Sequence, residues 1–266
     1  MKRLALPVLP LFILSLIGCS SSDDAEEEVY TESYFQFYNG SANSAATYFG
    51  EIDGNALGVA SYGDASGLIA TEEGEYDFEF YRYDADDQIV TVKEATFELH
   101  EGEKSIVILS GDYDSPAFMQ YAYDREELAD HFRLFATSVI DDGQAFDLYM
   151  SRAGEPFSAA YLLANIGYQS FEELTYWDPD TDTSSDTYSL DFDEGEYIVY
   201  LTLPGESFPI FESATISFIY DTEYVLALRR STGVLSDNVE IDFIINSTSV
   251  YTFSDDDALA QFRVYN

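Results

Sequence analysis

The sequence predicts an all-β chain built from two repeats. Polar and apolar residues alternate with a period of two along most of it, and 22 Tyr and 20 Phe occur among its 266 residues. Such alternation, rich in aromatic residues, is typical of strands with one buried and one exposed face. The tetrapeptide Glu-Gly-Glu-Tyr occurs at 73–76 and again at 194–197. We therefore expect two all-β domains of similar plan.

The first 18 residues have the pattern of a secretory signal peptide. Lys2 and Arg3 precede an apolar run over residues 4–17, which is shorter than the roughly 20 residues that span a membrane. Residues 16–19, Leu-Ile-Gly-Cys, resemble the lipobox of bacterial lipoproteins. This resemblance implies cleavage before Cys19 and acylation of its thiol, so the lipid would hold the protein on a membrane.

Cys19 is the only cysteine, so no disulfide can form within the chain. A buried structural cysteine would need a folded core around it, and the acidic residues that follow, 20–28, cannot supply one. We expect residues 19–28 to form a lipidated acidic tether. Ser20 follows the cysteine where Asp could stand, which by the same resemblance favours an outer-membrane location in the bacterial cell envelope, facing the periplasm or the cell surface.

Charge limits the partners of the mature chain. Without Lys2 and Arg3, nine of the 11 basic side chains remain against 51 acidic ones. This field repels phosphate backbones, so we expect no nucleic-acid partner. It also repels anionic membrane surfaces. The acidity has three open explanations: solubility in salty surroundings, colloidal stability and binding of divalent cations.

The strands of the first repeat follow in order after the tether. Residues 75–83, EYDFEFYRY, place Tyr76, Phe78 and Phe80 on one face and acidic residues on the other. Residues 95–109 give a strand, a turn containing glycine and a second strand, which we interpret as a hairpin. Gly74 is interpreted as part of the turn that feeds the long strand.

The second repeat has the same order of elements. Alternation recurs at 145–151 and 239–245, and residues 214–228 again predict a strand, a turn and a strand. Helical periodicity is weak throughout, and residues 124–132 are its best and short candidate.

Three segments look like the opening strand of a repeat: residues 34–38, 131–135 and 261–265. Two repeats need only two such strands, so one is left over. Residues 258–266 could begin a truncated third repeat, close the second domain, or pair with another molecule through an unpaired edge. The sequence leaves all three alternatives open.

These features resemble a family of bacterial lipoproteins and secreted proteins that carries a domain of unknown function. The resemblance rests on Tyr-Gly-x-x-Ser (Tyr62, Gly63 and Ser66) followed by Gly-x-Tyr at 74–76. The second copy, at 166–170, keeps the Gly and replaces the Tyr. The resemblance implies two tandem immunoglobulin-like β-sandwich domains, at about 29–126 and 127–266, and no known enzymatic activity.

The second repeat carries an insertion at 171–193, where the first repeat has six residues. Its carboxylates at relative positions 1, 3, 5 and 9 match the start of a calcium loop of the EF-hand type; they are Asp178, Asp180, Asp182 and Asp186. Thr183 stands where such a loop requires glycine, and Ser189 replaces the bidentate glutamate at its end. A calcium site and a solvated acidic loop are the two alternatives, and the solvated loop is favoured because Asp, Ser, Thr and Pro are ordinary loop residues.

The same insertion contains Tyr176 and Trp177, the only tryptophan. Beside the carboxylates of 176–188 they could form an aromatic platform for a carbohydrate. The favoured alternative is that Trp177 packs onto the body of the domain, as large aromatic side chains usually do. Tyr81 and Tyr83 alternate with the core face of their strand, so we expect them to face solvent or a partner.

No motif for catalysis is found. His100 and His131 lie outside any metal-ligand spacing, and Ser66 lacks the setting of a catalytic serine. We therefore expect a non-enzymatic envelope lipoprotein that acts as a structural, spacer or adhesion-type module and needs no cofactor. The alternatives are a surface lipoprotein that binds calcium or carbohydrate through 176–188 and, less favoured, an envelope hydrolase.

Overall fold

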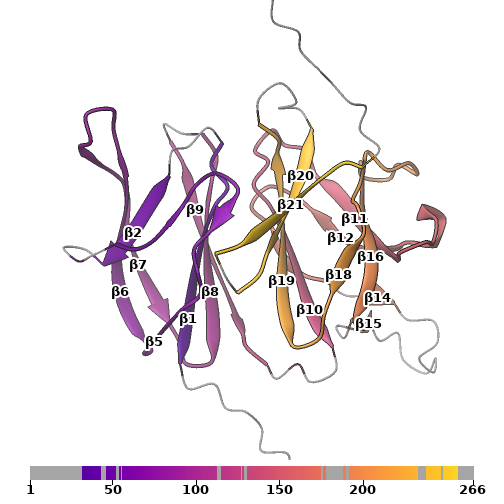
Figure 1. Cartoon of the computed structure of the whole chain (residues 1–266), viewed down its shortest axis with the longest axis horizontal. Helices are drawn as coiled ribbons and strands as arrows, with labels where there is room; N and C mark the ends of the chain where they lie inside the picture. The colour runs from indigo at the N-terminus through magenta and orange to yellow at the C-terminus, as the bar shows by residue number, and fades with distance from the viewer. Residues whose placement is uncertain are drawn as a thin grey trace, which may run out of the picture.

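The chain folds almost entirely into β-strands, which confirms the predicted all-β class (Figure 1). The computed structural model describes residues 32–42, 46–51, 54, 56–112, 115–126, 128, 131–174, 176–177, 188–189, 192–232, 238–246 and 248–256. Within these ranges the only helix is one 3-10 turn, η1 (Phe157–Ala159). The described part of 124–132 is not helical, because it links the end of one strand to the start of the next.

The first half of the chain forms two sheets from nine strands. The outer sheet has the order β3-β2-β6-β7, and in the inner sheet β4 and β5 both pair with β1, which is followed by β8 and β9. The outer strands are β2 (Thr47–Glu51), β3 (Ala56–Ala60), β6 (Gly74–Tyr83) and β7 (Ile89–Leu99). The inner strands are β1 (Ser33–Asn39), β4 (Asp64–Ala65), β5 (Ile69–Thr71), β8 (Glu103–Ser110) and β9 (Ala117–Asp124).

The second half repeats this plan. Its inner sheet has the order β13-β10-β19-β20-β21, and its outer sheet the order β12-β11-β16-β17, with β18 also on β16. The inner strands are β10 (Phe132–Ser138), β13 (Phe171–Glu173), β19 (Thr222–Arg230), β20 (Val239–Ile244) and β21 (Val250–Ser254). The outer strands are β11 (Phe146–Arg152), β12 (Tyr161–Ile166), β16 (Gly195–Thr202), β17 (Phe211–Glu212) and β18 (Ile216–Phe218). Two short strands, β14 (Tyr176–Trp177) and β15 (Tyr188–Ser189), pair with each other.

The two predicted hairpins are wrong in their pairing, although their strands exist. β7 pairs with β6, whereas β8 pairs with β1 and β9, so the turn at Gly102 carries the chain from the outer to the inner sheet. The turn at Asp221 does the same between β18 and β19. Such turns connect the two layers of a sandwich, and local sequence cannot distinguish them from hairpin turns.

Each half has its own apolar core between its outer and inner sheets. Phe78 and Phe80 of β6 point inward and stack with Phe35 and Phe49, as the alternation of 75–83 predicts. The second core is larger and contains Phe132, which lies face to face with Phe218 at a centroid distance of 4.6 Å.

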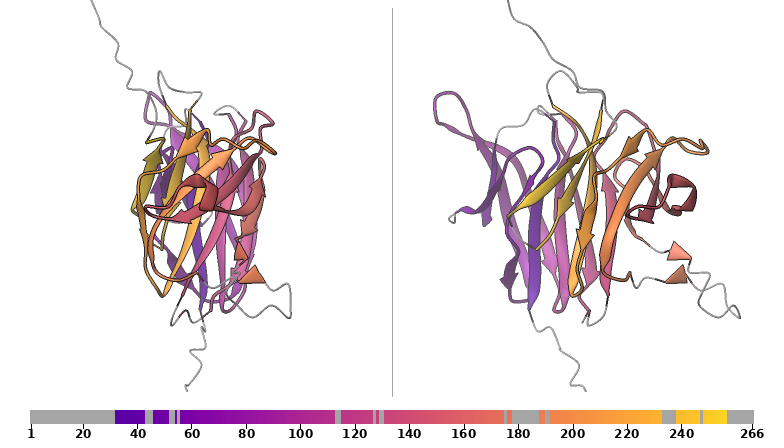
Figure 2. Two further views of the ribbon diagram at one scale, coloured as in Figure 1. Left: turned by 90° about the vertical axis from the view of Figure 1, so that its right-hand side faces the viewer. Right: turned by 45° about the vertical axis from the view of Figure 1, so that its right-hand side comes forward.

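A third apolar layer lies between the two inner sheets, and we call it the junction. Ile106 and Ile108 of β8 and Val225 and Ala227 of β19 are fully buried there, while the residues that alternate with them face the cores of their own halves. Each buried Ile or Val side chain contributes on the order of 1.5–3 kcal/mol when it leaves water. The molecule is therefore a stack of four sheets (Figures 1 and 2).

Burial on both faces accounts for the character of the central strands. β8 reads Ser-Ile-Val-Ile-Leu over 105–109 and β19 reads Tyr-Val-Leu-Ala-Leu over 224–228, without polar alternation. These strands form the two parallel pairings, β1 with β8 and β10 with β19. Parallel strands are usually covered on both faces, so the junction is part of the architecture.

The predicted opening strands 34–38 and 131–135 correspond to β1 and β10. The third segment, 258–266, lies outside the described residues. The edge of the second inner sheet is instead extended by β21, which pairs with β20.

Candidate functional site

A group of hydrogen-bonded polar side chains crosses the junction around Asp242 of β20. The Asp242 carboxylate accepts hydrogen bonds from the Tyr38 hydroxyl at 2.7 Å, from Arg229 Nε at 2.6 Å and from Thr252 at 2.7 Å. Asp242 and Tyr38 are fully buried. Because Tyr38 lies in the first half and the other three in the second, this group joins the halves.

Electrostatics keeps this group in fixed charge states. Burial opposes the charge of Arg229, but its hydrogen bond to Asp242 and the charge of that carboxylate outweigh burial and raise the pKa of the guanidinium. Burial, reinforced by Asp242, raises the pKa of the Tyr38 hydroxyl. The guanidinium also pairs with Glu240. The Tyr38 hydroxyl is the group of the first half that donates to the fully buried Asp242 carboxylate, so separating the halves would cost this hydrogen bond to a charged group.

Tyr62 and Gly63 of the sequence motif pack against Arg229 and so contribute to the contact between the halves. The Tyr62 ring lies 4.9 Å from the Arg229 guanidinium and its hydroxyl donates to the Arg230 carbonyl at 2.7 Å. Gly63 has φ = +82°, and a Cβ there would lie 2.9 Å from Arg229 Nε. The glycine is therefore required by both backbone conformation and space. Ser66 is structural, because its hydroxyl accepts from the Phe37 amide and donates to a carbonyl.

The junction contains a second charged group, around Glu223 of β19. Its carboxylate lies 3.5 Å from Arg125 and 3.8 Å from Arg133. Lys104 of β8 is buried beside it and donates to Asn246 at 2.6 Å. Burial lowers the pKa of the Lys104 ammonium to about 8, against the opposing charge of Glu223. Burial raises the pKa of Glu223, while the neighbouring cations, led by Lys104, act against that rise.

These two groups contain four of the eight described basic side chains: Lys104, Arg125, Arg133 and Arg229. Among the described basic residues only Lys93 and Arg152 are exposed, and Arg152 is paired with Asp193. The described surface is consequently acidic almost everywhere, whereas the cations are concentrated at the junction.

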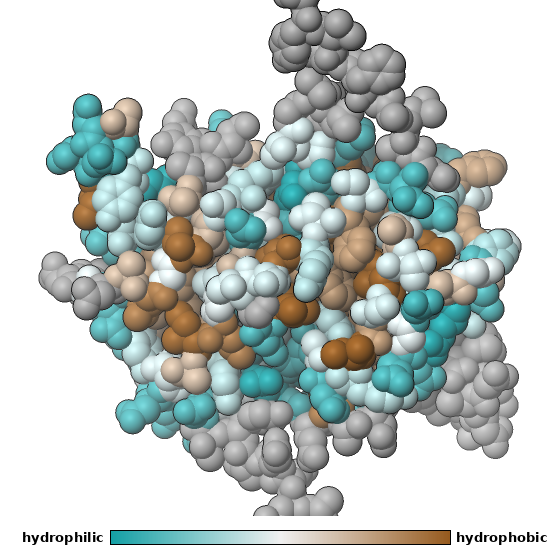
Figure 3. Space-filling model, in the orientation of Figure 1, coloured by the Kyte–Doolittle hydropathy of each residue, from teal (hydrophilic) through white to brown (hydrophobic). Residues whose placement is uncertain are grey.

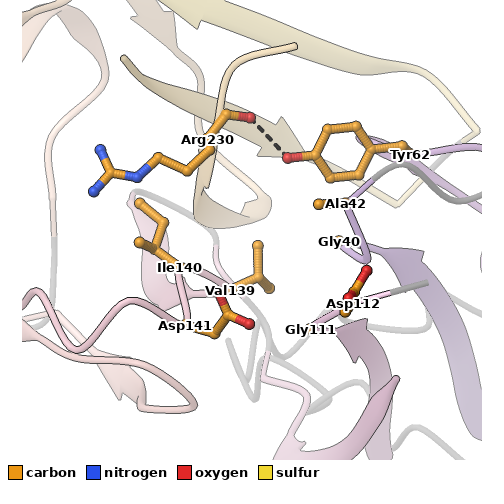
Figure 4. A pocket seen from close by; sticks show the side chains of 9 residues that line it. All are labelled: Gly40, Ala42, Tyr62, Gly111, Asp112, Val139, Ile140, Asp141 and Arg230. Carbon is orange, nitrogen blue, oxygen red and sulfur yellow. Dashed lines mark hydrogen bonds between the residues drawn. The ribbon is translucent and has the colours of Figure 1, made fainter. Parts of the chain in front are cut away.

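The junction opens into a cavity of about 270 Å³ at one end of the strands (Figure 4). Both halves line it, with apolar Val139 and Ile140, the carboxylates of Asp112 and Asp141, and Arg230. The Arg230 guanidinium pairs with Asp142. Its described lining combines exposed backbone at glycine residues with charges of both signs, and includes no Ser, Thr, Cys, His or Lys side chain.

A second cavity, of about 220 Å³, opens into the core of the first half. It lies at the open edge between β3 and β5, with Leu57 and Ile69 at its mouth and Glu51 as the charged residue among its described lining. Apolar residues gather over this part of the molecule, around β1 and β2 (Figure 3). Leu57 is 46% exposed, so the edge is incompletely covered.

The outer face of the first outer sheet carries a cluster of tyrosines, which we call the tyrosine surface. Tyr48 and Tyr81 are cross-strand partners and stack at 5.4 Å. Tyr83 meets both rings edge-on, at 5.2 and 5.8 Å. Val59 lies opposite Tyr48 and Ile89 opposite Tyr83, and paired residues of an antiparallel sheet share a face. Tyr83 is 43% and Ile89 59% exposed.

Most of the predicted site residues lie outside the described ranges. This holds for Cys19 in the tether and for the four aspartates of the insertion, 178, 180, 182 and 186, so the lipid and the calcium site stay predictions. The backbones of Tyr176 and Trp177 form β14, which faces 188–189 in β15, but their side chains are not described.

The described histidines are not part of a cluster. His100 lies in the turn after β7 and His131 immediately before β10. Within the described ranges no three His, Cys, Asp or Glu side chains are placed to hold a metal ion. No described helix is long and apolar enough to cross a membrane.

The polar residues of the junction escape sequence reasoning. Lys104, Glu223, Arg229 and Asp242 stand in strands whose other residues predict burial, and a charge in such a strand is ordinarily placed on its exposed face. The one available signal is the continuous apolar run of β8 and β19, which indicates burial on both faces.

No protein-family model matches the sequence, and no curated protein matches it either. The resemblance to the lipoprotein family therefore rests on sequence features only: the lipobox at 16–19, the two repeats, and the short motifs around Tyr62 and Gly74.

Proposed function

We propose that this chain is a non-enzymatic cell-envelope lipoprotein that acts as a structural, spacer or adhesion-type module, with two tandem immunoglobulin-like domains anchored through a lipid on Cys19. The observation that carries the proposal is the junction. The two halves share the apolar layer of the junction and its two buried charged groups, and we expect them to move as one rigid block. Such a block suits a protein that holds its outer surface at a fixed distance from the membrane.

The position of the tether supports the same role. The described chain begins at residue 32, directly before β1, which is hydrogen-bonded on both sides within an inner sheet. A tether at 19–28 would thus be connected to the centre of the block. The proposed location is the outer membrane, facing the periplasm or the cell surface, and no cofactor is proposed.

Metabolic labelling with radioactive palmitate tests the anchor. The full chain should incorporate label and partition into the detergent phase, whereas Cys19→Ala should do neither. Ser20→Ala, which alters the neighbouring side chain and leaves the thiol, is the control and should be labelled as the unchanged chain is. Labelling of Cys19→Ala, or its absence in the unchanged chain, contradicts a lipoprotein.

A second test separates a spacer from a binding module that uses the insertion. Removal of 176–188 should leave the unfolding midpoint and the membrane association unchanged if the insertion is solvated decoration. A loss of attachment of cells that carry the shortened chain, with unchanged stability, would instead assign the binding role to that loop.

A further inference from the structure

The tyrosine surface is built to be contacted, because its rings are held in a fixed arrangement although they are accessible. Tyr48, Tyr81 and Tyr83 contact one another by stacking and edge-on packing. Rings ordered in this way lose little conformational entropy when a partner covers them. They extend across neighbouring strands of a sheet whose other face is the core of the first half.

Carboxylates predominate beside the rings, where Lys93, the partner of Phe80, is the exposed cation of β7. Glu79 lies on the same face, two residues before Tyr81, and its cross-strand partner is Glu94. Four residues further along the strand, beyond the pair Asp77 and Thr96, Glu75 lies opposite Glu98. Like charges directly opposite each other destabilise a sheet, and a cation that binds between them removes this repulsion. A partner that covers the tyrosines would therefore gain most if it were positively charged.

The described residues show four times how the chain packs a cation of this kind. Each time a guanidinium lies over a tyrosine ring and beside a carboxylate. The four groups are Arg229 over Tyr62 with Asp242, Arg125 over Tyr34 with Glu223, Arg133 over Tyr123 with Glu173, and Arg152 over Tyr197 with Asp193, at 4.9, 4.5, 5.6 and 4.4 Å from the ring centroids. Among the described residues none places such a cation over Tyr48, Tyr81 or Tyr83.

We propose that the tyrosine surface, with Glu79 and Glu94 beside it, docks an arginine-bearing polypeptide segment of a partner protein. The guanidinium planes lie on the exposed rings and the carboxylates accept their N–H groups. Arginine fits better than lysine because its planar group can stack and hydrogen-bond at the same time. The inference deepens the proposed adhesion-type role, but the docking chemistry does not depend on the lipid.

The test measures binding of fluorescein-labelled oligoarginine to the full chain in neutral detergent micelles, with oligolysine of equal length as the comparison. Any strongly acidic protein attracts both peptides, so the informative quantity is the ratio of the two affinities. We expect oligoarginine to bind about tenfold more tightly, which corresponds to about 1.4 kcal/mol and to one or two cation–π contacts.

The variant Tyr81→Ala/Tyr83→Ala should bring this ratio close to one, and Tyr81→Phe/Tyr83→Phe should keep it, because phenylalanine retains a ring face. Tyr251→Ala is the matched control, since Tyr251 is an exposed tyrosine of β21 in the other half. Equal affinities for the two peptides, no binding of either, or an equal effect of Tyr251→Ala would each overturn the proposal.

A carbohydrate partner is the competing outcome. Neutral oligosaccharides, titrated as a separate arm, should not displace oligoarginine; displacement that is lost with Tyr81→Ala/Tyr83→Ala would overturn the proposal in favour of a glycan. Failure of the peptide arm leaves palmitate labelling unaffected, and failure of labelling leaves the peptide ratio unaffected, so the two proposals fail separately.

Discussion

The free energy of unfolding should rise with pH under alkaline conditions, and replacing Lys104 by methionine should abolish this rise. Lys104 is fully buried at the junction, and its pKa falls from 10.5 to about 8. In the unfolded chain the amine stays protonated up to about pH 10.4. Between these values the unfolded state binds one more proton, so the free energy of unfolding increases with pH.

The magnitude follows from the two pKa values. The full difference corresponds to about 3.4 kcal/mol at 1.36 kcal/mol per pKa unit. Between pH 7.5 and 9.5 the integrated increase is about 2 kcal/mol. The window ends there because burial raises the pKa values of Tyr38 and Tyr123 at the same junction. Unfolded tyrosines lose their protons near pH 10, which lowers the stability of the folded state above that pH.

Urea unfolding followed by circular dichroism, at constant ionic strength and at intervals of half a pH unit, measures this rise. Lys104→Met should give a flat profile from pH 7.5 to 9.5. Lys93→Met removes an exposed lysine of β7 and should keep the rise. A rise that persists in Lys104→Met, or one that vanishes equally in Lys93→Met, would refute the reasoning.

Three further outcomes follow from the junction and the insertion. Asp242→Asn should lower the free energy of unfolding by about 1.5–3 kcal/mol, because Arg229 loses a charged hydrogen-bond acceptor while Glu240 still pairs with its guanidinium; a loss below about 1 kcal/mol in urea unfolding would contradict this. Gly63→Ala should be clearly more destabilising than Gly143→Ala in the same assay. Both glycines have φ near +80°, but only the Cβ at Gly63 meets another group. Equal losses of unfolding free energy in the two variants would contradict this prediction, because they would mean that backbone strain alone accounts for both. Calcium should change the fluorescence of Trp177 no more than magnesium does, because the insertion has a β-branched residue where a calcium loop needs glycine. A saturable change with calcium alone would contradict this prediction.

The sequence predicts the strands better than their partners. The alternation over 75–83 identifies β6 and its buried face, and residues 239–245 identify β20. The turn near Gly102 predicts a hairpin, because a glycine between two strands is the ordinary sequence signal for one. Its strands lie in different sheets, and this depends on contacts with β1 and β6, which are distant in sequence.

The junction is the part that local patterns do not reveal. Charged residues such as Lys104 and Asp242 are tolerated in its centre only because partners from both halves meet there. A period of two does indicate which tyrosines of β6 face outward, and Tyr81 and Tyr83 do so. That they gather with Tyr48 requires the register of β2 against β6, which side-chain periodicity alone does not specify.

The place of β1 also decides how the protein would respond to mechanical load. A force on the chain before residue 32 pulls along β1, whose backbone pairs with β8 from Tyr34↔Lys104 to Asn39↔Leu109 and with β4 and β5 on its other side. These hydrogen bonds lie across the direction of pull, so they are loaded in shear and must break together, whereas an edge strand pulled from its end would unzip one bond at a time. The block would therefore act as a clamp that yields only at high force.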